Sequence, residues 1–198
     1  MTASKVDVSN MALNHCGVDV SIESMTELSK AARVCNRWYD HARKEALEAF
    51  NWGFARKRLV VAEHGEDPPD TWAYRYQYPA DCLVVRELQN PVSRTSDPVP
   101  YEIEIAPDST KSILCDLEDP IIVYTYDLED LGMFSTHFIS TLAYLLAHYI
   151  VFTMTAKRTM RADLGAMYNA YLKRAPAMNA NEKQEDQPVD ADWITGRQ

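Results

Sequence analysis

Glycine and positive charge are both scarce in this chain of 198 residues. Its 6 glycines stand apart from one another, which argues against a P-loop or a dinucleotide-binding loop, since both need clustered glycines to cradle phosphate. Lysine and arginine total 20 against 29 aspartates and glutamates, so the formal net charge is -9. Because phosphate contacts require clustered cations, this balance disfavours non-specific binding to nucleic acid. It suits an ordinary soluble protein, and equally a surface past which DNA slides without sticking.

Motifs of nucleophilic catalysis and of secretion are also missing. The sequence contains no serine or cysteine nucleophile motif, and its 4 cysteines are widely spaced without a Cys-x-x-Cys pair. Three of them lie in apolar runs, so we expect reduced, buried thiols. The first residues, Met-Thr-Ala-Ser-Lys-Val-Asp, lack the apolar core of a signal peptide, which predicts synthesis inside the cell.

The 5 histidines form no metal-binding pattern. His41 and His64 have no acidic or thiol companion at the spacing of a metal site. His137 and His148 fall roughly on one face of a predicted helix, where we interpret them as core or subunit-contact histidines. We therefore expect no catalytic residue, no metal and no cofactor.

What the sequence does contain is a long stretch without formal charge. Residues 131–156 include no Asp, Glu, Lys or Arg, and about 20 apolar residues suffice to span a bilayer. The stretch also holds serines, threonines and histidines, whose insertion into lipid is unfavourable without a second span to face. We expect a central, largely buried helix, with a membrane helix as the weaker alternative. Its core would comprise Phe138, Leu142, Leu145, Leu146, Tyr149 and Val151 or Phe152.

Two helices are predicted before residue 56. Ser4 and Asp7 have the spacing of a capping box at the start of the first helix, and Gly17 is suited to its end. The second helix is expected from about Leu28 to Phe50. Its packing stripe would consist of Ala31, Cys35, Trp38, Ala42, Ala46 and Ala49. Its solvent-facing side would consist of Arg33, Arg37, Asp40, Arg43, Lys44 and Glu48.

Residues 56–126 change to the alternating pattern of short strands. Five or six strands are expected, joined by turns and loops without intervening helices, so their sheet should be antiparallel. The strand beginning at Trp72 carries aromatic residues of one parity, which a period of two places on one face. We interpret this face as a rigid aromatic platform and a candidate interface. Its members are Trp72, Tyr74, Tyr76 and Tyr78.

The carboxy-terminal part combines a helix with a polar arm. A last helix is expected from about Arg158 into the 170s, and Pro176 should end or kink it. Residues 181–190 are too polar to bury enough apolar area to offset ordering. The arm then ends in apolar and charged residues that are typical interface anchors, so it either folds back on its own domain or docks on a neighbouring molecule. The candidate anchors are Asp192, Trp193, Ile194 and Arg197.

One tetrapeptide, Asp-Leu-Glu-Asp, occurs twice, at 116–119 and 127–130. The copies border the strand expected at Ile121–Tyr126, so they should lie near its opposite ends. That separation argues against a shared two-carboxylate site. Turn formation or helix capping is the favoured interpretation, while a weak divalent-cation site and an acidic rim on an oligomer stay open.

Together these patterns predict an α+β protein, a bundle of about four helices with an antiparallel β-rich insertion and an extended carboxy-terminal arm. The expected divisions are residues 1–55 and 128–178 for the bundle, 56–127 for the insertion and 179–198 for the arm.

Several segments also resemble one known family. The alanine-rich second helix runs into Phe-Asn-Trp-Gly-Phe-Ala at 50–55, and the aromatic strand runs into Tyr-Pro-Ala-Asp-Cys-Leu at 78–83. Tyr-Glu-Ile at 101–103, Ile-Val-Tyr at 122–124, Leu-Leu-Ala-His at 145–148 and Asp-Trp-Ile-Thr-Gly-Arg at 192–197 continue the pattern. In order and spacing they resemble the tail tubular protein A family of short-tailed phages, the adaptor beneath the portal.

This resemblance implies a structural protein of the virion, made in the host cytoplasm, and not an enzyme. Family members form a ring, twelve copies in the familiar cases, between the portal protein and the tail nozzle, and DNA passes through without specific binding. The arm would dock on the portal through Trp193, Ile194 and Arg197, and the β region would face neighbouring copies or the nozzle. No membrane association is implied.

Two other classes of function stay open. An intracellular enzyme or small-molecule binder would use His137, His148 or the acidic turns, and it would be a discrete monomer or dimer with a concave pocket. A tail-directed chaperone or regulator would share the arm but would not form a ring.

Overall fold

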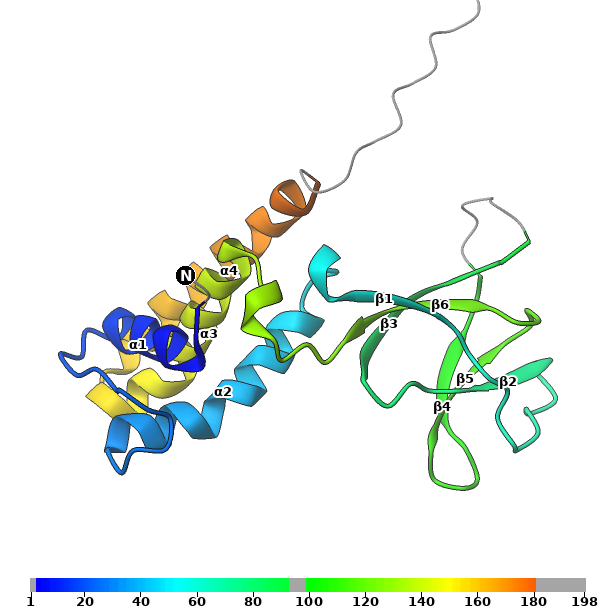
Figure 1. Cartoon of the computed structure of the whole chain (residues 1–198), viewed down its shortest axis with the longest axis horizontal. Helices are drawn as coiled ribbons and strands as arrows, with labels where there is room; N and C mark the ends of the chain where they lie inside the picture. Colours follow the sequence, from blue (N-terminus) through cyan, green and yellow to red (C-terminus); the bar gives the residue numbers. More distant parts are fainter. Residues whose placement is uncertain (1–2, 93–98, 181–198) are drawn as a thin grey trace, which may run out of the picture.

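A computed structural model describes residues 3–92 and 99–180, which form two bodies lying side by side (Figure 1). One body is helical and the other is built from strands. The described residues contain four α-helices and two three-stranded antiparallel sheets, so the expected α+β class is confirmed. The β body is one insertion between the second and third helices, as the sequence predicts. The arm residues Asp192, Trp193, Ile194 and Arg197 lie outside the described residues.

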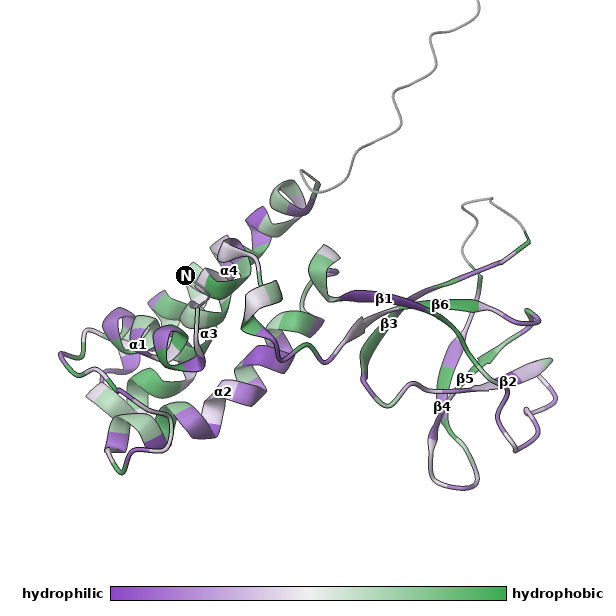
Figure 2. Ribbon diagram, viewed as in Figure 1, coloured by the Kyte–Doolittle hydropathy of each residue, from purple (hydrophilic) through white to green (hydrophobic). Residues whose placement is uncertain are grey.

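The helical body packs three helices around a fourth. The helices are α1 (Lys5–His15), α2 (Lys30–Glu48), α3 (Thr136–Thr155) and α4 (Arg158–Ala180). Helix α3 lies against each of the other three, and its ribbon is predominantly apolar (Figure 2). Because α3 has the length and composition of a membrane span, its packing distinguishes the two expectations: half of its most apolar window is buried inside the protein. This arrangement is that of a core helix.

Helix α1 begins as its sequence predicts. The Ser4 hydroxyl accepts a hydrogen bond from the Asp7 backbone N–H at 3.1 Å, while the Ser4 backbone N–H donates to Asp7 Oδ2 at 2.8 Å. This reciprocal capping box satisfies two amide donors that a helix start leaves without partners. The helix ends at Cys16, and Gly17 takes the left-handed conformation (φ 64°) that turns the chain away.

The interior stripe of α2 is broader than its alanines suggest. Ala31, Cys35, Ala42 and Ala46 are buried as expected. The expected Ala49 is exposed and Trp38 is only partly buried. Three larger residues join the buried side, namely Tyr39, Arg43 and Leu47.

The interior of α3 also differs in part from the expected set. Phe138, Leu142 and Leu146 are fully buried, and Leu145 and Val151 are buried with them. Tyr149 is half-buried and its hydroxyl donates to Glu45 on α2, while Phe152 is exposed.

Helix α4 does not end at Pro176, which was one of the two expected outcomes. The proline lies inside the helix, which continues to Ala180. It removes one backbone donor, but packing on both sides holds the last turn. Ala175 is fully buried, and Asn179 Oδ1 accepts a hydrogen bond from the Gly53 backbone N–H at 2.8 Å. The helix therefore extends two residues past the predicted start of the arm.

The β body is a sandwich of two sheets instead of the single sheet expected. Strands β1 (Arg56–Val60), β6 (Ile121–Tyr126) and β3 (Cys82–Gln89) form one sheet in that order. Strands β2 (Tyr74–Gln77), β5 (Lys111–Cys115) and β4 (Glu102–Ile105) form the other. Their inner faces enclose a second apolar core, separate from that of the helices. The core residues are Val61, Tyr76, Val85, Leu88, Ile113, Cys115, Ile122 and Tyr124.

Candidate interaction surfaces and the junction between the two bodies

An arginine from the β body donates hydrogen bonds to the carboxy-terminal end of helix α2. Arg86 on β3 donates from Nη2 to the carbonyl oxygens of Glu48 and Phe50 at 2.9 Å each and of Leu47 at 3.2 Å. Its Nε donates to Thr125 Oγ1 at 2.9 Å within its own sheet. The last carbonyls of a helix have no partner in the helix and carry partial negative charge. A guanidinium therefore satisfies them and fixes β3 to that helix end.

A second arginine makes the reciprocal contact from α2. The Arg43 side chain is 1% exposed, and its Nη1 donates to Asp127 Oδ1 and to the Leu128 carbonyl, at 2.6 Å each. Lys44 Nζ lies 2.8 Å from Asp127 Oδ2. Burial opposes ionisation of Asp127, but the hydrogen bonds from Lys44 and Arg43 outweigh it, so the pKa of this carboxyl lies below its ordinary value. The sequence placed Arg43 on the solvent side, and the structure corrects this.

The two arginines tie the two bodies together at their junction. One reaches from the sheet to the helix, and the other reaches from the helix to the chain leaving β6. Apolar contacts surround them, because Leu83 and Tyr126 of the β body pack against the core of the helical body. Separating a buried arginine from its partners is costly, so these contacts oppose movement of one body relative to the other.

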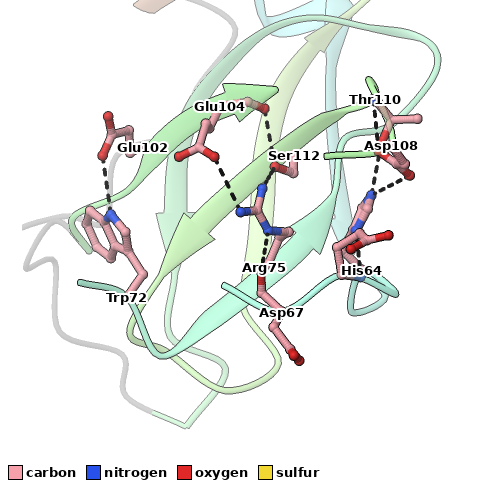
Figure 3. Close-up of polar contacts among 10 residues, drawn as sticks. His64, Asp67, Trp72, Arg75, Glu102, Glu104, Asp108, Thr110 and Ser112 are labelled. Carbon is pink, nitrogen blue, oxygen red and sulfur yellow. Dashed lines mark hydrogen bonds and ion pairs between the residues drawn. The ribbon is translucent and has the colours of Figure 1, made fainter. Parts of the chain in front are cut away.

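The predicted aromatic platform is divided between surface and interior. Tyr76 is fully buried in the β core, and its hydroxyl donates to the Leu117 carbonyl at 2.9 Å. Tyr74 is half-buried beside it in β2. Trp72 and Tyr78 lie just outside the strand, half-buried; Trp72 Nε1 donates to Glu102 Oε2 at 3.2 Å (Figure 3). Only the partly exposed rings are placed to meet another molecule.

His137 and His148 both join α3 to α4. A ring nitrogen of each lies 2.9 Å from a backbone carbonyl on α4, that of Tyr171 and that of Arg161 respectively. A carbonyl only accepts, so each of these nitrogens carries the proton. Their use in helix packing agrees with the structural interpretation and gives no support to a shared catalytic site.

The two Asp-Leu-Glu-Asp copies have different local roles. In the first, Asp116 accepts from the Ala73 backbone N–H and Asp119 takes a positive φ of 49° in a turn. In the second, Asp127 pairs with Arg43, and Asp130 caps the short 3-10 helix at Leu131–Met133 by accepting from the Gly132 N–H. The predicted capping is confirmed for Asp130, and the first copy bends the chain after β5. Among residues 3–92 and 99–180, no three His, Cys, Asp or Glu side chains are grouped as metal ligands would be.

An open polar hollow of about 440 Å³ lies on the β body. His64 lines it, with Nε2 at 2.9 Å from Thr110 Oγ1 and 3.4 Å from Asp108 Oδ2 (Figure 3). His41 likewise has an acidic neighbour, since its Nε2 is 3.6 Å from Glu45 Oε2. Both histidines thus have the acidic companions that the sequence did not indicate. Each is a single pair, and mixed charges around the hollow favour no particular ligand.

The outermost strands β1 and β4 leave apolar side chains exposed. Leu59 and Val60 on β1 are 46% and 56% exposed, and Ile103 and Ile105 on β4 are 44% and 57% exposed. An exposed strand edge with apolar side chains is a template for pairing with another chain. Among the described residues, these two edges are the strongest candidates for an interaction surface on the β body.

Comparisons with known proteins add no assignment. A scan against protein-family models found no matching family, and a search of the curated proteins found no relative.

Proposed function

We propose that this chain is a structural adaptor of a short-tailed phage particle, which forms a ring beneath the portal, joins head to tail and surrounds the passage of the DNA. The observation that carries the proposal is a helical body joined to a projecting β body through Arg43 and Arg86, in the order that the family resemblance implies. The proposal includes a homo-oligomeric ring, about twelve copies by that resemblance, and contacts with the portal and the tail nozzle.

A fixed angle between the bodies is what a ring subunit requires. In a closed ring every copy uses the same two unlike faces, and with about twelve copies each contact turns by roughly 30°. Variation in the angle between the bodies would be repeated at every contact and would oppose closure. The paired arginines Arg43 and Arg86 limit this variation, because each binds across the junction.

The charge of the chain agrees with a DNA conduit. A net charge of -9 provides few sites that hold phosphate, so DNA would pass without being retained. Lysines substituted for acidic residues on the inner wall of the ring should slow genome ejection from otherwise intact particles. Unchanged ejection kinetics would contradict this part of the proposal.

The test is light scattering coupled to size exclusion, on the protein alone and mixed with its cognate portal. The full chain should form a ring-sized complex with the portal, and a chain ending at Ala180 should not. This end point keeps the whole of α4, including the contact of Asn179 with Gly53, so only the arm is lost. Trp193→Ala should weaken the complex, while Gln198→Ala serves as the matched control.

The same experiment separates the competing functions. A small oligomer indifferent to the portal and to truncation would refute the adaptor and favour a small-molecule binder. Thermal shifts with ligand panels would then be directed first at the hollow beside His64. A chain that binds the portal through its arm but never exceeds one copy per site, without contacts between copies, would favour a chaperone.

A further inference from the structure

The free edges of the two sheets lie on opposite sides of the β body. The chain runs from the end of β1 directly to the edge of β2, where the Gln77 N–H donates to the Ala62 carbonyl at 2.9 Å (Figure 1). Tyr101, just before β4, donates to the Val85 carbonyl of β3 at 3.2 Å. Strands β1 and β2 therefore share one side of the sandwich, and β3 and β4 share the other.

These contacts also show which edges are available. Residues following β1 cover the edge of β2, and Tyr101 covers part of the edge of β3. Strands β1 and β4 each stand at the end of their sheet order and pair on one side only among the described residues. One available edge is thus presented on each side of the β body.

The two edges carry opposite charge. Strand β1 has the sequence Arg-Lys-Arg-Leu-Val, and its ribbon is largely hydrophilic in Figure 2. Strand β4 has the sequence Glu-Ile-Glu-Ile. Arg58 is exposed and has no ion-pair partner among the described residues. The Glu104 side chain is 42% exposed even though it contacts Arg75 (Figure 3).

From this complementarity we infer that β1 of one copy pairs with β4 of the next copy. The inference deepens the proposed function and rests on it, since it names the strands that join neighbouring copies in the ring. Basic edges repel each other and so do acidic edges, which disfavours pairing of like strands. The unlike pair is favoured, and because the two edges are on opposite sides, repeated pairing runs head to tail.

The side chains of the two strands favour one of the two ways in which their faces could become continuous. Alternate residues of a strand point to opposite faces, so β1 presents Arg58 on one face and Lys57 on the other. Leu59 and Val60 are likewise on opposite faces of β1. The glutamates of β4 share one face and its isoleucines share the other. An antiparallel register with Glu104 opposite Arg58 also places Ile103 opposite Leu59 and leaves Glu102 diagonal to Arg58. With Glu104 opposite Lys57, Ile103 would lie opposite Arg58, so the first arrangement is favoured.

Cross-linking between copies tests the pairing directly. Residues opposed on antiparallel strands have Cα atoms about 4.5–5.5 Å apart, which is within the reach of a disulfide. In a Cys82→Ser background the remaining native thiols are buried. Ile103→Cys chains would be mixed with Leu59→Cys or with Val60→Cys chains, which place the thiol on either face of β1. Asp70→Cys, on an exposed turn, is the matched control.

The expected result is a covalent dimer in one of the two mixtures, in the protein alone or in its portal complex. Each variant by itself should give no more dimer than Asp70→Cys. A chain carrying both changes of the reactive pair should give a ladder of longer species, because each copy then links two neighbours. No cross-linking above the control in either sample would overturn the pairing, as would dimers formed by a single variant alone.

Charge reversal provides a second measurement. Arg58→Glu or Glu102→Lys alone should weaken association of copies about tenfold, and the double variant should recover it. Asp70→Lys makes the same charge change as Glu102→Lys away from the edge and should have no effect. Failure of both experiments in a ring that still assembles on the portal would overturn the pairing and leave the adaptor. Copies that pair through β1 and β4 but do not bind the portal would support the strand pairing and refute the adaptor function.

Discussion

Replacing Asp127 with asparagine should destabilise the protein by breaking the buried contact at the junction. Arg43 is 1% exposed, so its guanidinium would lose its closest anion without gaining water. Removal of one partner from a buried ion pair costs about 3–5 kcal/mol. The Asp127 side chain keeps 22% exposure and Glu129 lies 3.8 Å from Arg43. Both reduce the effect, so we expect about 3 kcal/mol.

A loss of that size is measurable by thermal unfolding followed by circular dichroism. For a chain of this length it lowers the melting temperature by about 6–12 °C. Asp70→Asn removes an exposed carboxylate from a turn and should change the melting temperature little. The double replacement Arg43→Met with Asp127→Leu removes both charges and should recover most of the stability. An Asp127→Asn variant within about 0.5 kcal/mol of the original protein at neutral pH would refute the reasoning.

The pH dependence gives an independent check on the same pair. Because the folded-state pKa of Asp127 is lowered, its stabilising contribution is fully present above the ordinary carboxyl pKa of about 4. The contribution is lost as the pH falls through the lowered folded value. The stability difference between the original protein and Asp127→Asn should therefore shrink as the pH falls below about 4. A difference that persists unchanged in acid would contradict the ion pair as its source.

Three further predictions concern the junction, the buried tyrosines and the thiols. Arg86→Met should lower the free energy of unfolding by about 2–4 kcal/mol, measured in urea, because it leaves carbonyls at the end of α2 without a donor. Arg86→Lys should show only part of this loss. Burial raises the pKa of several tyrosines to about 12. The stability of the fold should therefore fall above about pH 10, where the tyrosines of the unfolded chain ionise first. Spectrophotometric titration measures this ionisation. The tyrosines concerned are Tyr39, Tyr76, Tyr124, Tyr149 and Tyr168. Burial also raises the pKa of Cys16 to about 12 and of Cys35 to about 11, so both should resist a thiol reagent until the protein unfolds.

Signals contained within one turn or one strand were predictable from the sequence. The capping box of Ser4 and Asp7 and the buried helix within residues 131–156 depend on neighbouring residues, and both are confirmed. The alternation of residues 56–126 predicted five or six antiparallel strands, of which the structure has six, but not their division into two sheets. Alternation specifies which side chains share a face, and it contains no information on how the faces are stacked.

Features that depend on distant partners were not predictable. Arg43 contacts Asp127, which lies 84 positions along the chain. The periodicity of an amphipathic helix assigns arginine to the solvent-facing side and gives no sign of such a partner. Arg86 had a weaker signal, as a lone cation in the apolar run Cys-Leu-Val-Val-Arg. Pro176 was expected to end or kink its helix because the local sequence indicates the lost donor and not the contact of Asn179 with Gly53, and the helix continues past it.

The repeated tetrapeptide shows how tertiary context decides between equivalent local sequences. Both Asp-Leu-Glu-Asp copies follow a strand, yet the first aspartate of one accepts a backbone N–H while that of the other holds a buried arginine. The difference comes from α2, which brings Arg43 to residue 127 and has no counterpart near residue 116. The carboxylate of Asp127 thereby joins α2 to the chain that leaves β6. The ring proposal therefore predicts that changes at Asp127 impair assembly more than equal losses of stability produced elsewhere.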